Sequence, residues 1–441
     1  MRKIVAIFLT IFLLVNLGLG QEYATVLNRL TLNESDTLVF LGDSITHQCL
    51  YTQYIEDFFY TRLPRQRIRF HNAGVSGDKA ADALLRFEED VAQFKPKFIT
   101  VLLGMNDGRY IHYDQATFET YERNMTTLLD QIEKNGARAI VMTPTMFDMR
   151  AYRIGVKANT RDKGVMKRSP YYNGVLAFYG AWLREQAMVR GLGFVDMYSP
   201  LNKLTLEKRK SNPTFTLIKD AIHPGAPGQV VMAYALLDNL DVPRTVSSIH
   251  CYRDEYGQWQ LDTIGGELFD AWEEGDRGGF TFLADSLPWV LPDEARPGYE
   301  LMHAGTNLSQ EILRINGLQS GRYNVKINGQ VIGTYSDVDL AGGIELQNNS
   351  KTPQYQQALQ VALLNKERNE KVVHPLRNQW SQLKGRRRRE NPDNPSEEFK
   401  KWYEQFKQKV EELHQKSKEY EEKIYKINQP QPRRYELQLV N

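Results

Sequence analysis

The chain has 441 residues, a length that suggests two or three domains and leaves ample sequence for a buried core. Lys and Arg total 56 and Asp and Glu total 54, so the formal net charge is only +2, which argues against a nucleic-acid partner recruited by bulk charge. Two cysteines exclude a disulfide-rich scaffold or a cysteine-rich metal module, and 11% aromatic residues argue against wholesale disorder.

The first twenty residues have the pattern of a cleavable signal peptide. Two basic residues precede an apolar run over 4–15, and small residues stand just before Gln21. The run is short for a membrane-spanning helix, and no later stretch reaches that length. We expect residues 1–20 to be removed and the mature chain to be secreted or periplasmic, without a stable membrane span; an uncleaved anchor is the alternative.

Residues 37–240 alternate short apolar runs with longer amphipathic stretches. This pattern is typical of a parallel sheet with helices on both faces, because its strands bury both of their sides. The expected strands lie at 37–42, 68–73, 98–104, 138–144 and 193–198, and the expected helices near 51–62, 79–94, 115–135, 171–190 and 227–240. We therefore expect a three-layer α/β domain within residues 21–246.

The composition changes after residue 241. Residues 247–349 are rich in Gly, Thr, Tyr and Val and contain few helical patterns, so we expect a small β-rich accessory module. Within it, Asn328-Gly329 separates two alternating segments and fits the type I′ turn of a hairpin.

Residues 350–441 are predicted to form a charged helical region. One helix is expected to open at Thr352 with Pro353 in its first turn. Pro375 must end or kink this helix, because proline lacks the backbone N–H that a helix interior requires.

A second C-terminal helix is expected to open at Asn394. Its apolar residues, from Phe399 to Ile427, step by three, four or seven and so form one stripe. We expect the stripe to pack within the chain, since an exposed stripe would promote aggregation. Residues 435–440 largely alternate and are expected to return to the β-rich module as a final strand.

Four polar segments are expected to lie together at the carboxyl edge of the sheet. Ser44, Gly77 and Asn106 each follow one of the first three strands, and Asp220 and His223 precede the last helix. Ligands of parallel sheets bind at the carboxyl ends of the strands. A serine at such an end, with an Asp three residues before a His, offers a nucleophile, a general base and the carboxylate that orients the base. The N–H groups of Ser44 and Gly77 and the Asn106 amide are three candidate oxyanion donors.

Each of these residues by itself also has a purely structural interpretation. A serine after a strand often caps a helix, a loop glycine often supplies a positive φ, and an Asn-Asp-Gly run often makes a turn. The occurrence of all four segments, in order, at the functional ends of one predicted sheet favours the catalytic interpretation.

The chain resembles the SGNH/GDSL hydrolase family over roughly half of its length, about residues 37–240. Four blocks carry the resemblance: GDSI (42–45, with Ile in place of the eponymous Leu), SGD (76–78), GMND (104–107) and DAIHP (220–224). The resemblance implies a flavodoxin-like sheet order 2-1-3-4-5. It also implies a catalytic triad of Ser44, Asp220 and His223 and an oxyanion hole of Ser44, Gly77 and Asn106.

Other motifs leave fewer expectations. No P-loop, H-E-x-x-H or G-x-G-x-x-G pattern occurs after residue 20, and we expect neither a cofactor nor a metal ion. Residues 148–170 are predicted to form a long basic loop, in which Arg150 and Arg153 are candidate substrate-binding residues; a simply solvated loop is the alternative. A disulfide between Cys49 and Cys251 is left open.

The expected activity is that of a serine esterase acting on carboxylic esters, with an acylated glycan or related polymer as its substrate and no nucleic-acid partner. A lysophospholipase or thioesterase is the main rival, although a long acyl chain needs an apolar groove and the basic segment argues against one. A non-catalytic binding protein on the same fold is the alternative of another class. The acyl donor and the oligomeric state do not follow from the sequence.

Overall fold

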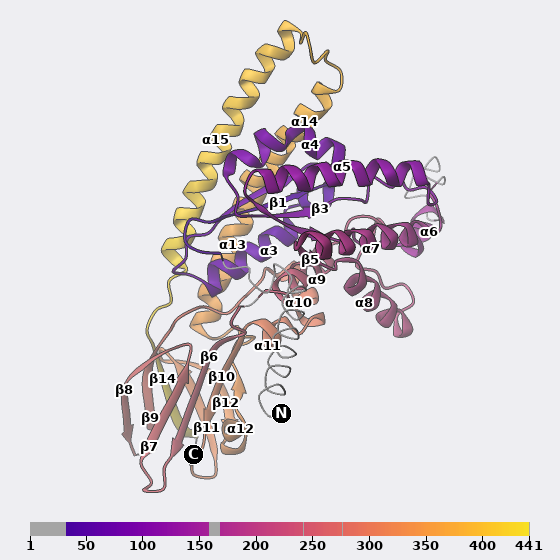
Figure 1. Ribbon diagram of the computed structural model, residues 1–441. Coiled ribbons are helices and arrows are strands. Elements are labelled where there is room, and N and C mark those ends of the chain that lie inside the picture. Colours follow the sequence, from indigo (N-terminus) through magenta and orange to yellow (C-terminus); the bar gives the residue numbers. More distant parts are fainter. Residues whose placement is uncertain (1–31, 158–167, 241, 276, 441) are drawn as a thin grey trace, which may run out of the picture.

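The computed structural model describes residues 32–157, 168–240, 242–275 and 277–440 (Figure 1). A parallel sheet lies between layers of helices, two further sheets lie together at one end of the molecule, and long helices project from the other end. The expected signal peptide at 1–20 lies outside the described residues. Within these ranges, no helix has both the length and the apolar character needed to cross a membrane.

The parallel sheet has the order β2-β1-β3-β4-β5, which confirms the flavodoxin-like fold class. Its strands are β1 (Thr37–Gly42), β2 (Arg69–Gly74), β3 (Phe98–Leu102), β4 (Arg138–Met142) and β5 (Gly193–Val195). At the carboxyl ends, Gly42 of β1 is in register with Gly74 of β2 and Leu102 of β3. The loops that follow these three strands therefore begin side by side.

Helices cover the two faces of this sheet over separate apolar clusters. Val39 and Phe40 are adjacent in β1 and point to opposite faces. Phe40 belongs to a cluster with α3 and α9, and Val39 to a cluster with α4, α5 and α7. The helices of this region are α2 (Ser44–His47), α3 (Leu50–Arg62), α4 (Ala80–Asp90), a 3₁₀ turn (Ala92–Phe94), α5 (Gln115–Lys134), α6 (Met149–Lys157), α7 (Tyr172–Arg190), α8 (Tyr198–Ser211) and α9 (Ala226–Leu237). The sequence analysis did not predict α6 or α8.

The helix α6 corrects the expected loop at 148–170. Asp148 begins this helix, since its Oδ1 accepts the N–H of Ala151 at 3.1 Å. The basic residues that suggested a solvated loop are compatible with a helix, because Arg and Lys are good helix formers. Residues 158–167 of the expected loop lie outside the described residues.

The β-rich region contains two sheets packed on one apolar cluster. The four-stranded sheet has the order β13-β10-β6-β7, and its strands are β6 (Thr245–Arg253), β7 (Trp259–Ile264), β10 (Gln310–Ile315) and β13 (Ile344–Glu345). The five-stranded sheet has the order β12-β11-β14-β9-β8, and its strands are β8 (Gly266–Glu274), β9 (Arg277–Ala284), β11 (Arg322–Ile327), β12 (Gln330–Ser336) and β14 (Arg433–Val440). The connections contain a 3₁₀ turn (Asp293–Ala295), α10 (Arg296–Leu301), α11 (Ala304–Leu308) and α12 (Asp337–Gly342).

Two sequence predictions are confirmed in the five-stranded sheet. Asn328 and Gly329 join β11 and β12 with φ angles of 51° and 80°, as a type I′ turn requires. The final strand, β14, lies between β11 and β9, so the end of the chain completes the sheet.

We call residues 353–427 the helical arm. It comprises α13 (Pro353–Arg368), a π-helical turn (Asn369–Val373), α14 (His374–Arg387) and α15 (Glu397–Ile427). Thr352 caps α13 as predicted, with its side chain accepting the N–H of Tyr355. The π turn immediately precedes Pro375, so the predicted interruption occurs there without ending the helical path.

One detail of the arm corrects the sequence analysis. The N-cap of α15 is Ser396 rather than Asn394, because Ser396 Oγ accepts the N–H of Phe399 at 3.1 Å.

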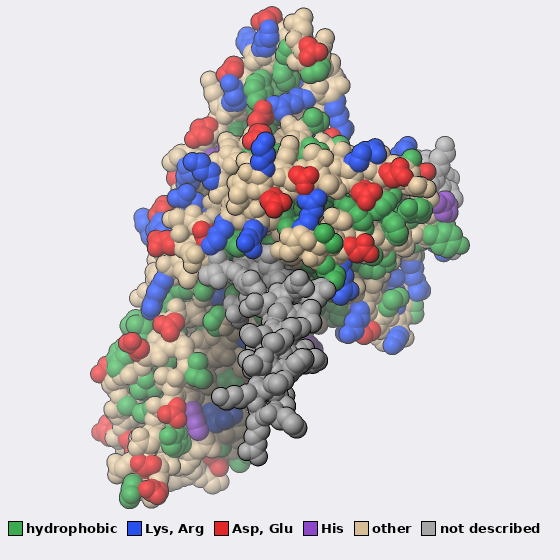
Figure 2. Space-filling model, viewed as in Figure 1, with side chains coloured by type: hydrophobic (Ala, Val, Ile, Leu, Met, Phe, Trp, Pro, Cys, Tyr) green, Lys and Arg blue, Asp and Glu red, His purple; other side chains and the backbone are tan. Residues whose placement is uncertain are grey.

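The apolar stripe of α15 packs within the chain. Phe406 and Leu413 share a buried cluster with Trp380 of α14 and Val75 after β2, and Ile424 joins the core beside β1. The stripe thus covers the α/β region, and β14 then returns to the β-rich sheets. On the face shown in Figure 2, basic and acidic side chains are interspersed over the helices, in keeping with the net charge of +2.

Candidate active site

Ser44 lies at the start of α2, directly after β1. Asp43 caps this turn, since its side chain accepts the N–H of Ile45 at 2.9 Å. Glycine at the end of β2 lets α2 approach closely: a Cβ on Gly74 would lie only 2.4 Å from the backbone nitrogen of His47. The local sequence therefore holds the serine hydroxyl at the carboxyl edge of the sheet.

Ser44, His223 and Asp220 form one chain of hydrogen bonds. Nε2 of His223 lies 2.8 Å from Ser44 Oγ, and Nδ1 lies 2.6 Å from Asp220 Oδ2. Burial opposes ionisation of Asp220, but hydrogen bonds from His223 and from two backbone N–H groups outweigh it and lower the pKa of this carboxyl to about 2. An ionised Asp220 favours the tautomer with the proton on Nδ1, which leaves Nε2 free to accept the serine proton.

A buried ion pair holds the turn that carries Asp220. Asp148, whose side chain is 1% exposed, accepts hydrogen bonds from Arg209 and from Thr216 Oγ1, both at 2.6 Å. Its backbone N–H also donates to the carbonyl of Ala221 at 2.9 Å. The φ of Ala221 is 75°, a left-handed value that is costly for alanine and that these contacts maintain.

The three candidate oxyanion donors lie at the same edge of the sheet. Gly77 has a φ of 70°, and the backbone N–H groups of Ser44 and Gly77 have no hydrogen-bond acceptor among the described residues. Asn106 Nδ2 lies 3.1 Å from the carbonyl oxygen of Asp78 and 3.3 Å from Asp43 Oδ2. The amide is therefore held in the site, with a long and exchangeable bond to Asp43.

Two buried carboxyl groups border this site. Burial raises the pKa of Asp43 to about 7, and the hydrogen bond from Ile45 offsets only part of the effect. Burial likewise raises the pKa of Asp107 to about 7, although its side chain accepts the N–H of Ala80 at 2.9 Å. Asp43 thus bonds to α2 and to Asn106 after β3, and Asp107 bonds to the start of α4.

Comparison with known proteins identifies the family of the α/β region. A model of the GDSL-like lipase/acylhydrolase family matches residues 40–231. Residues 40–231, somewhat less than half of the chain, form a domain of the SGNH/GDSL hydrolase family. As a member of it, the protein is a carboxylic ester hydrolase.

This SGNH/GDSL hydrolase is similar to an acetylxylan esterase of Geobacillus stearothermophilus, with 25% identity over 229 residues, 47% of this chain and 94% of the relative. It is also 31% identical over 74 residues to the uncharacterized lipoprotein YqeF of Bacillus subtilis (strain 168). This match covers 16% of this chain and 30% of that protein. Among solved structures, BT4096, described as a gut microbial diltiazem-metabolizing enzyme, aligns with a TM-score of 0.76 and 25% identity. That alignment covers 94% of this chain and 100% of the other, so the neighbour shares the accessory parts as well.

The candidate substrate-binding arginines of the hydrolase lie on α6. Arg150 and Arg153 are both exposed, and among the described residues neither side chain bonds to the candidate triad. Arg168 approaches the site instead: its guanidinium carbon lies 4.3 Å from the centre of the Tyr110 ring.

The remaining histidines and cysteines near the hydrolase core have structural partners. Nε2 of His47 bonds to Asn378, and His71 bonds to Asp90 at 3.2 Å. Cys49 and Cys251 are both buried free thiols, so the disulfide that the sequence left open is not formed.

Tyr110 is a site residue that the sequence analysis missed. Its hydroxyl donates to Asn106 Oδ1 at 3.0 Å and so fixes which end of the amide points into the hydrolase site. Tyr110 and the preceding Arg109 have φ angles of 59° and 56°. Two successive left-handed residues that are not glycine are unusual and mark a constrained turn. The sequence offers no signal for this turn, because φ angles cannot be read from residue types.

Proposed function

We propose that this chain is an exported serine esterase that removes acyl groups, above all acetyl groups, from a glycan or a related polymer. The observation that carries the proposal is the hydrogen-bonded chain from Ser44 Oγ to His223 and Asp220, at 2.8 and 2.6 Å. The similarity to an acetylxylan esterase supports an acetylated polysaccharide as the substrate.

In the proposed mechanism, Ser44 Oγ attacks the ester carbonyl carbon while His223 Nε2 takes the hydroxyl proton. The carbonyl oxygen becomes an oxyanion, which accepts hydrogen bonds from the N–H groups of Ser44 and Gly77 and from the Asn106 amide. The intermediate expels the alcohol, which receives the proton from His223 and leaves an acyl-serine. Water then attacks the acyl-serine and gives a proton to His223, which returns it to Ser44 Oγ as the carboxylic acid departs. Asp220 stays ionised throughout and stabilises the imidazolium.

Replacement of the serine tests this proposal. Ser44→Ala should fold normally and lose about 10³-fold or more in kcat on aryl acetates, because only oxyanion and binding contributions remain. A serine-directed phosphonate should add one adduct mass to the wild type and to the exposed-serine control Ser211→Ala, but not to Ser44→Ala. Near-wild-type turnover of Ser44→Ala would disprove the assignment.

A substrate panel tests the acyl and alcohol parts separately. Rates should fall as the acyl chain of an aryl ester lengthens, and acetylated xylan should be deacetylated. Diltiazem, an acetate ester, belongs in the panel because the structural neighbour is described as metabolizing it. A preference for long acyl chains would favour the lysophospholipase alternative instead. Export is tested by mass spectrometry of the N-terminal peptide of the secreted protein. This peptide should begin at Gln21.

A further inference from the structure

The helical arm reaches the candidate oxyanion hole from outside the α/β region. In Figure 1, α14 lies near α4, and Arg387 of α14 pairs with Glu89 of α4 at 2.7 Å. The same helix contacts β2. The loop that follows β2 carries Gly77, one of the proposed oxyanion donors. About three hundred residues of sequence separate the loop from the arm: the bond from Lys384 Nζ to Asp78, for example, spans 306 positions.

Lys384 of α14 bonds to Ser76 and Asp78, the residues on both sides of Gly77. Its Nζ lies 2.7 Å from Asp78 Oδ1 and 3.3 Å from the carbonyl oxygen of Ser76. The same ammonium would lie 3.9 Å from a Cβ built on Gly77. The side chains of Asp78 and Lys384 are 0% and 13% exposed, so water screens this ion pair poorly.

Asp78 connects this ion pair to the third oxyanion donor. Arg86 binds its other carboxylate oxygen at 2.7 Å, and its carbonyl oxygen accepts the Asn106 amide at 3.1 Å. A shift of Asp78 would therefore move two oxyanion donors: Gly77, which precedes Asp78 in the chain, and Asn106, which is hydrogen-bonded to it. Removal of Lys384 would leave a buried carboxylate oxygen without its cation, a strong force for rearrangement.

Two more residues of α14 hold the start of the loop. Arg377 donates to the carbonyl oxygen of Gly74 at 3.0 Å, and Asn378 bonds to His47 at 3.0 Å. The other ring nitrogen of His47, Nδ1, accepts the N–H of Ser76 at 3.2 Å.

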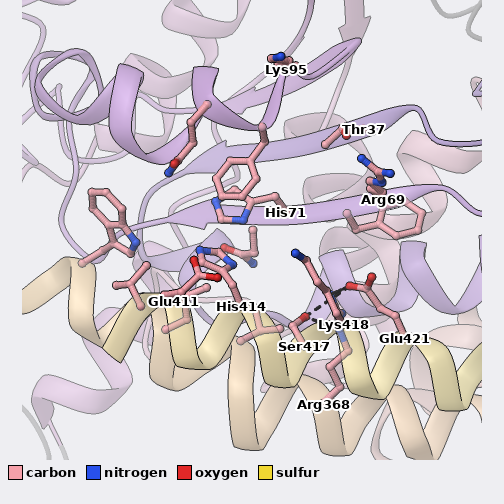
Figure 3. Close-up of a pocket in the computed structure, with 18 of the residues that line it drawn as sticks. Thr37, Arg69, His71, Lys95, Arg368, Glu411, His414, Ser417, Lys418 and Glu421 are labelled. Carbon is pink, nitrogen blue, oxygen red and sulfur yellow. Dashed lines mark hydrogen bonds and ion pairs between the residues drawn. The ribbon is translucent and has the colours of Figure 1, made fainter. Parts of the chain in front are cut away.

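Along part of α15 the arm is separated from the sheet. A cavity of about 1000 Å³ separates α15 from β1 and β2, and in Figure 3 His71 of β2 and His414 of α15 project toward each other across it. Their ring centroids are 5.6 Å apart. The arm therefore reaches the loop after β2 in two ways: through these polar contacts of α14, and through the apolar cluster that Val75 shares with Trp380 and Leu383.

We propose that the helical arm takes part in catalysis through Lys384, a positioning residue that holds Gly77 and Asn106 in the geometry of the oxyanion hole. The inference rests on the proposed function. It assigns the arm a role beyond covering apolar surface: it completes an active site whose reacting groups all lie in the α/β region.

Lys384→Met tests this role, because it keeps the length of the side chain and removes its charge. We expect kcat on an aryl acetate to fall roughly 10- to 100-fold, since displacement of a catalytic donor by about 1 Å has effects of that order. KM should stay within about twofold, because the donors act mainly on the transition state. The rate of phosphonate addition to Ser44 should fall in parallel, and Lys384→Arg should recover most of the activity.

The matched control is Lys371→Met on the same arm. Lys371 pairs with Glu367 at 2.6 Å and is 66% exposed, so this variant should keep wild-type kcat and melting temperature. Asp78→Asn disrupts the Lys384 pair from the other side, and Lys384→Met should add little further loss in that background. All rates are measured well below the melting temperature of each variant. If Lys384→Met does not fold, Asp78→Asn replaces it in the test.

The outcomes separate the two proposals. If Ser44→Ala is inactive while folded Lys384→Met, or Asp78→Asn in its place, has wild-type kcat, the role of Lys384 is wrong and the serine mechanism stands. A loss confined to KM or to thermal stability would also overturn the positioning role. If Ser44→Ala remains active, the proposed function itself fails, whatever Lys384 does.

Discussion

Tyr110 shows how a single hydroxyl can determine the orientation of a catalytic amide. Its bond to Asn106 Oδ1, at 3.0 Å, leaves Nδ2 facing the site. Tyr110→Phe should lower kcat about tenfold with little change in KM, because the amide then loses one of its fixed contacts. Steady-state rates on an aryl acetate check this, with Tyr113→Phe, at a half-exposed neighbouring tyrosine, as the control. Unchanged kcat in Tyr110→Phe would show that Asp43 and Asp78 orient the amide without it.

Asn106 itself is expected to act on the transition state. Asn106→Ala should lower kcat by about 10²–10³ with little change in KM, as for the loss of one oxyanion donor. The measurement is a full kcat and KM determination on one ester. A large rise in KM at unchanged kcat would instead assign Asn106 to substrate binding.

At the scale of elements, a buried ion pair joins α14 to Asp90, the last residue of α4. The side chain of Arg377 is 0% exposed and pairs with Asp90, which is also 0% exposed. Arg377→Leu should lower the free energy of unfolding by about 3–5 kcal/mol, because it leaves Asp90 with less compensation for its buried charge. Denaturant unfolding measures this. Arg388→Leu is the control. The Arg388 side chain pairs with Asp82 but is 61% exposed, so this ion pair should contribute less than about 1 kcal/mol to the free energy of unfolding. Equal losses in the two variants would contradict the argument.

The contact between arm and sheet is also expected to weaken in acid. Burial, reinforced by the charge of Arg377, lowers the pKa of His47 to about 4, and burial together with neighbouring His71 lowers that of His414 to about 3. Unfolded histidine titrates near 6.5, so the unfolded state takes up protons first as the pH falls. Stability should therefore be intact above about pH 6.5 and decline from there through pH 4 and below.

Melting temperatures between pH 7 and pH 4 check this prediction. The wild type should lose more stability over that interval than His414→Gln, which has no titrating group at this position. Parallel pH curves for the two proteins would show that His414 does not contribute.

At the scale of the whole molecule, the C-terminal quarter completes both the α/β region and the β-rich sheets. A chain that ends at Asn349 would lack β14, which lies between β11 and β9, and would leave Glu56 and Asp90 without their arginine partners from the arm. We expect it to be poorly soluble, to melt on the order of 10 °C lower or not to fold, and to have little esterase activity. Soluble yield, thermal unfolding and aryl acetate hydrolysis measure these properties. A truncated chain as soluble and heat-stable as the full chain would show that the arm is an independent appendage.

The sequence by itself determined the elements whose signals are local. Apolar runs predicted the five strands of the parallel sheet, Asn328-Gly329 predicted the hairpin of the β-rich region, and Thr352 predicted a helix start, because each signal depends on neighbours within a few residues. The motif blocks brought Ser44, Asp220 and His223 to one edge of the sheet, where the structure joins them by hydrogen bonds.

Only the tertiary structure decided which distant residues support that edge. Lys384 and Arg377 stand in a helix that has no catalytic motif, and Asp148 stood in what the sequence suggested was a basic loop. Nothing near these residues in the sequence records their partners, because an ion pair between segments hundreds of residues apart depends on how helices pack. A periodic pattern predicts that a helix buries one face, but the position of each charge on that face is set only when the helix meets the loop that it stabilises.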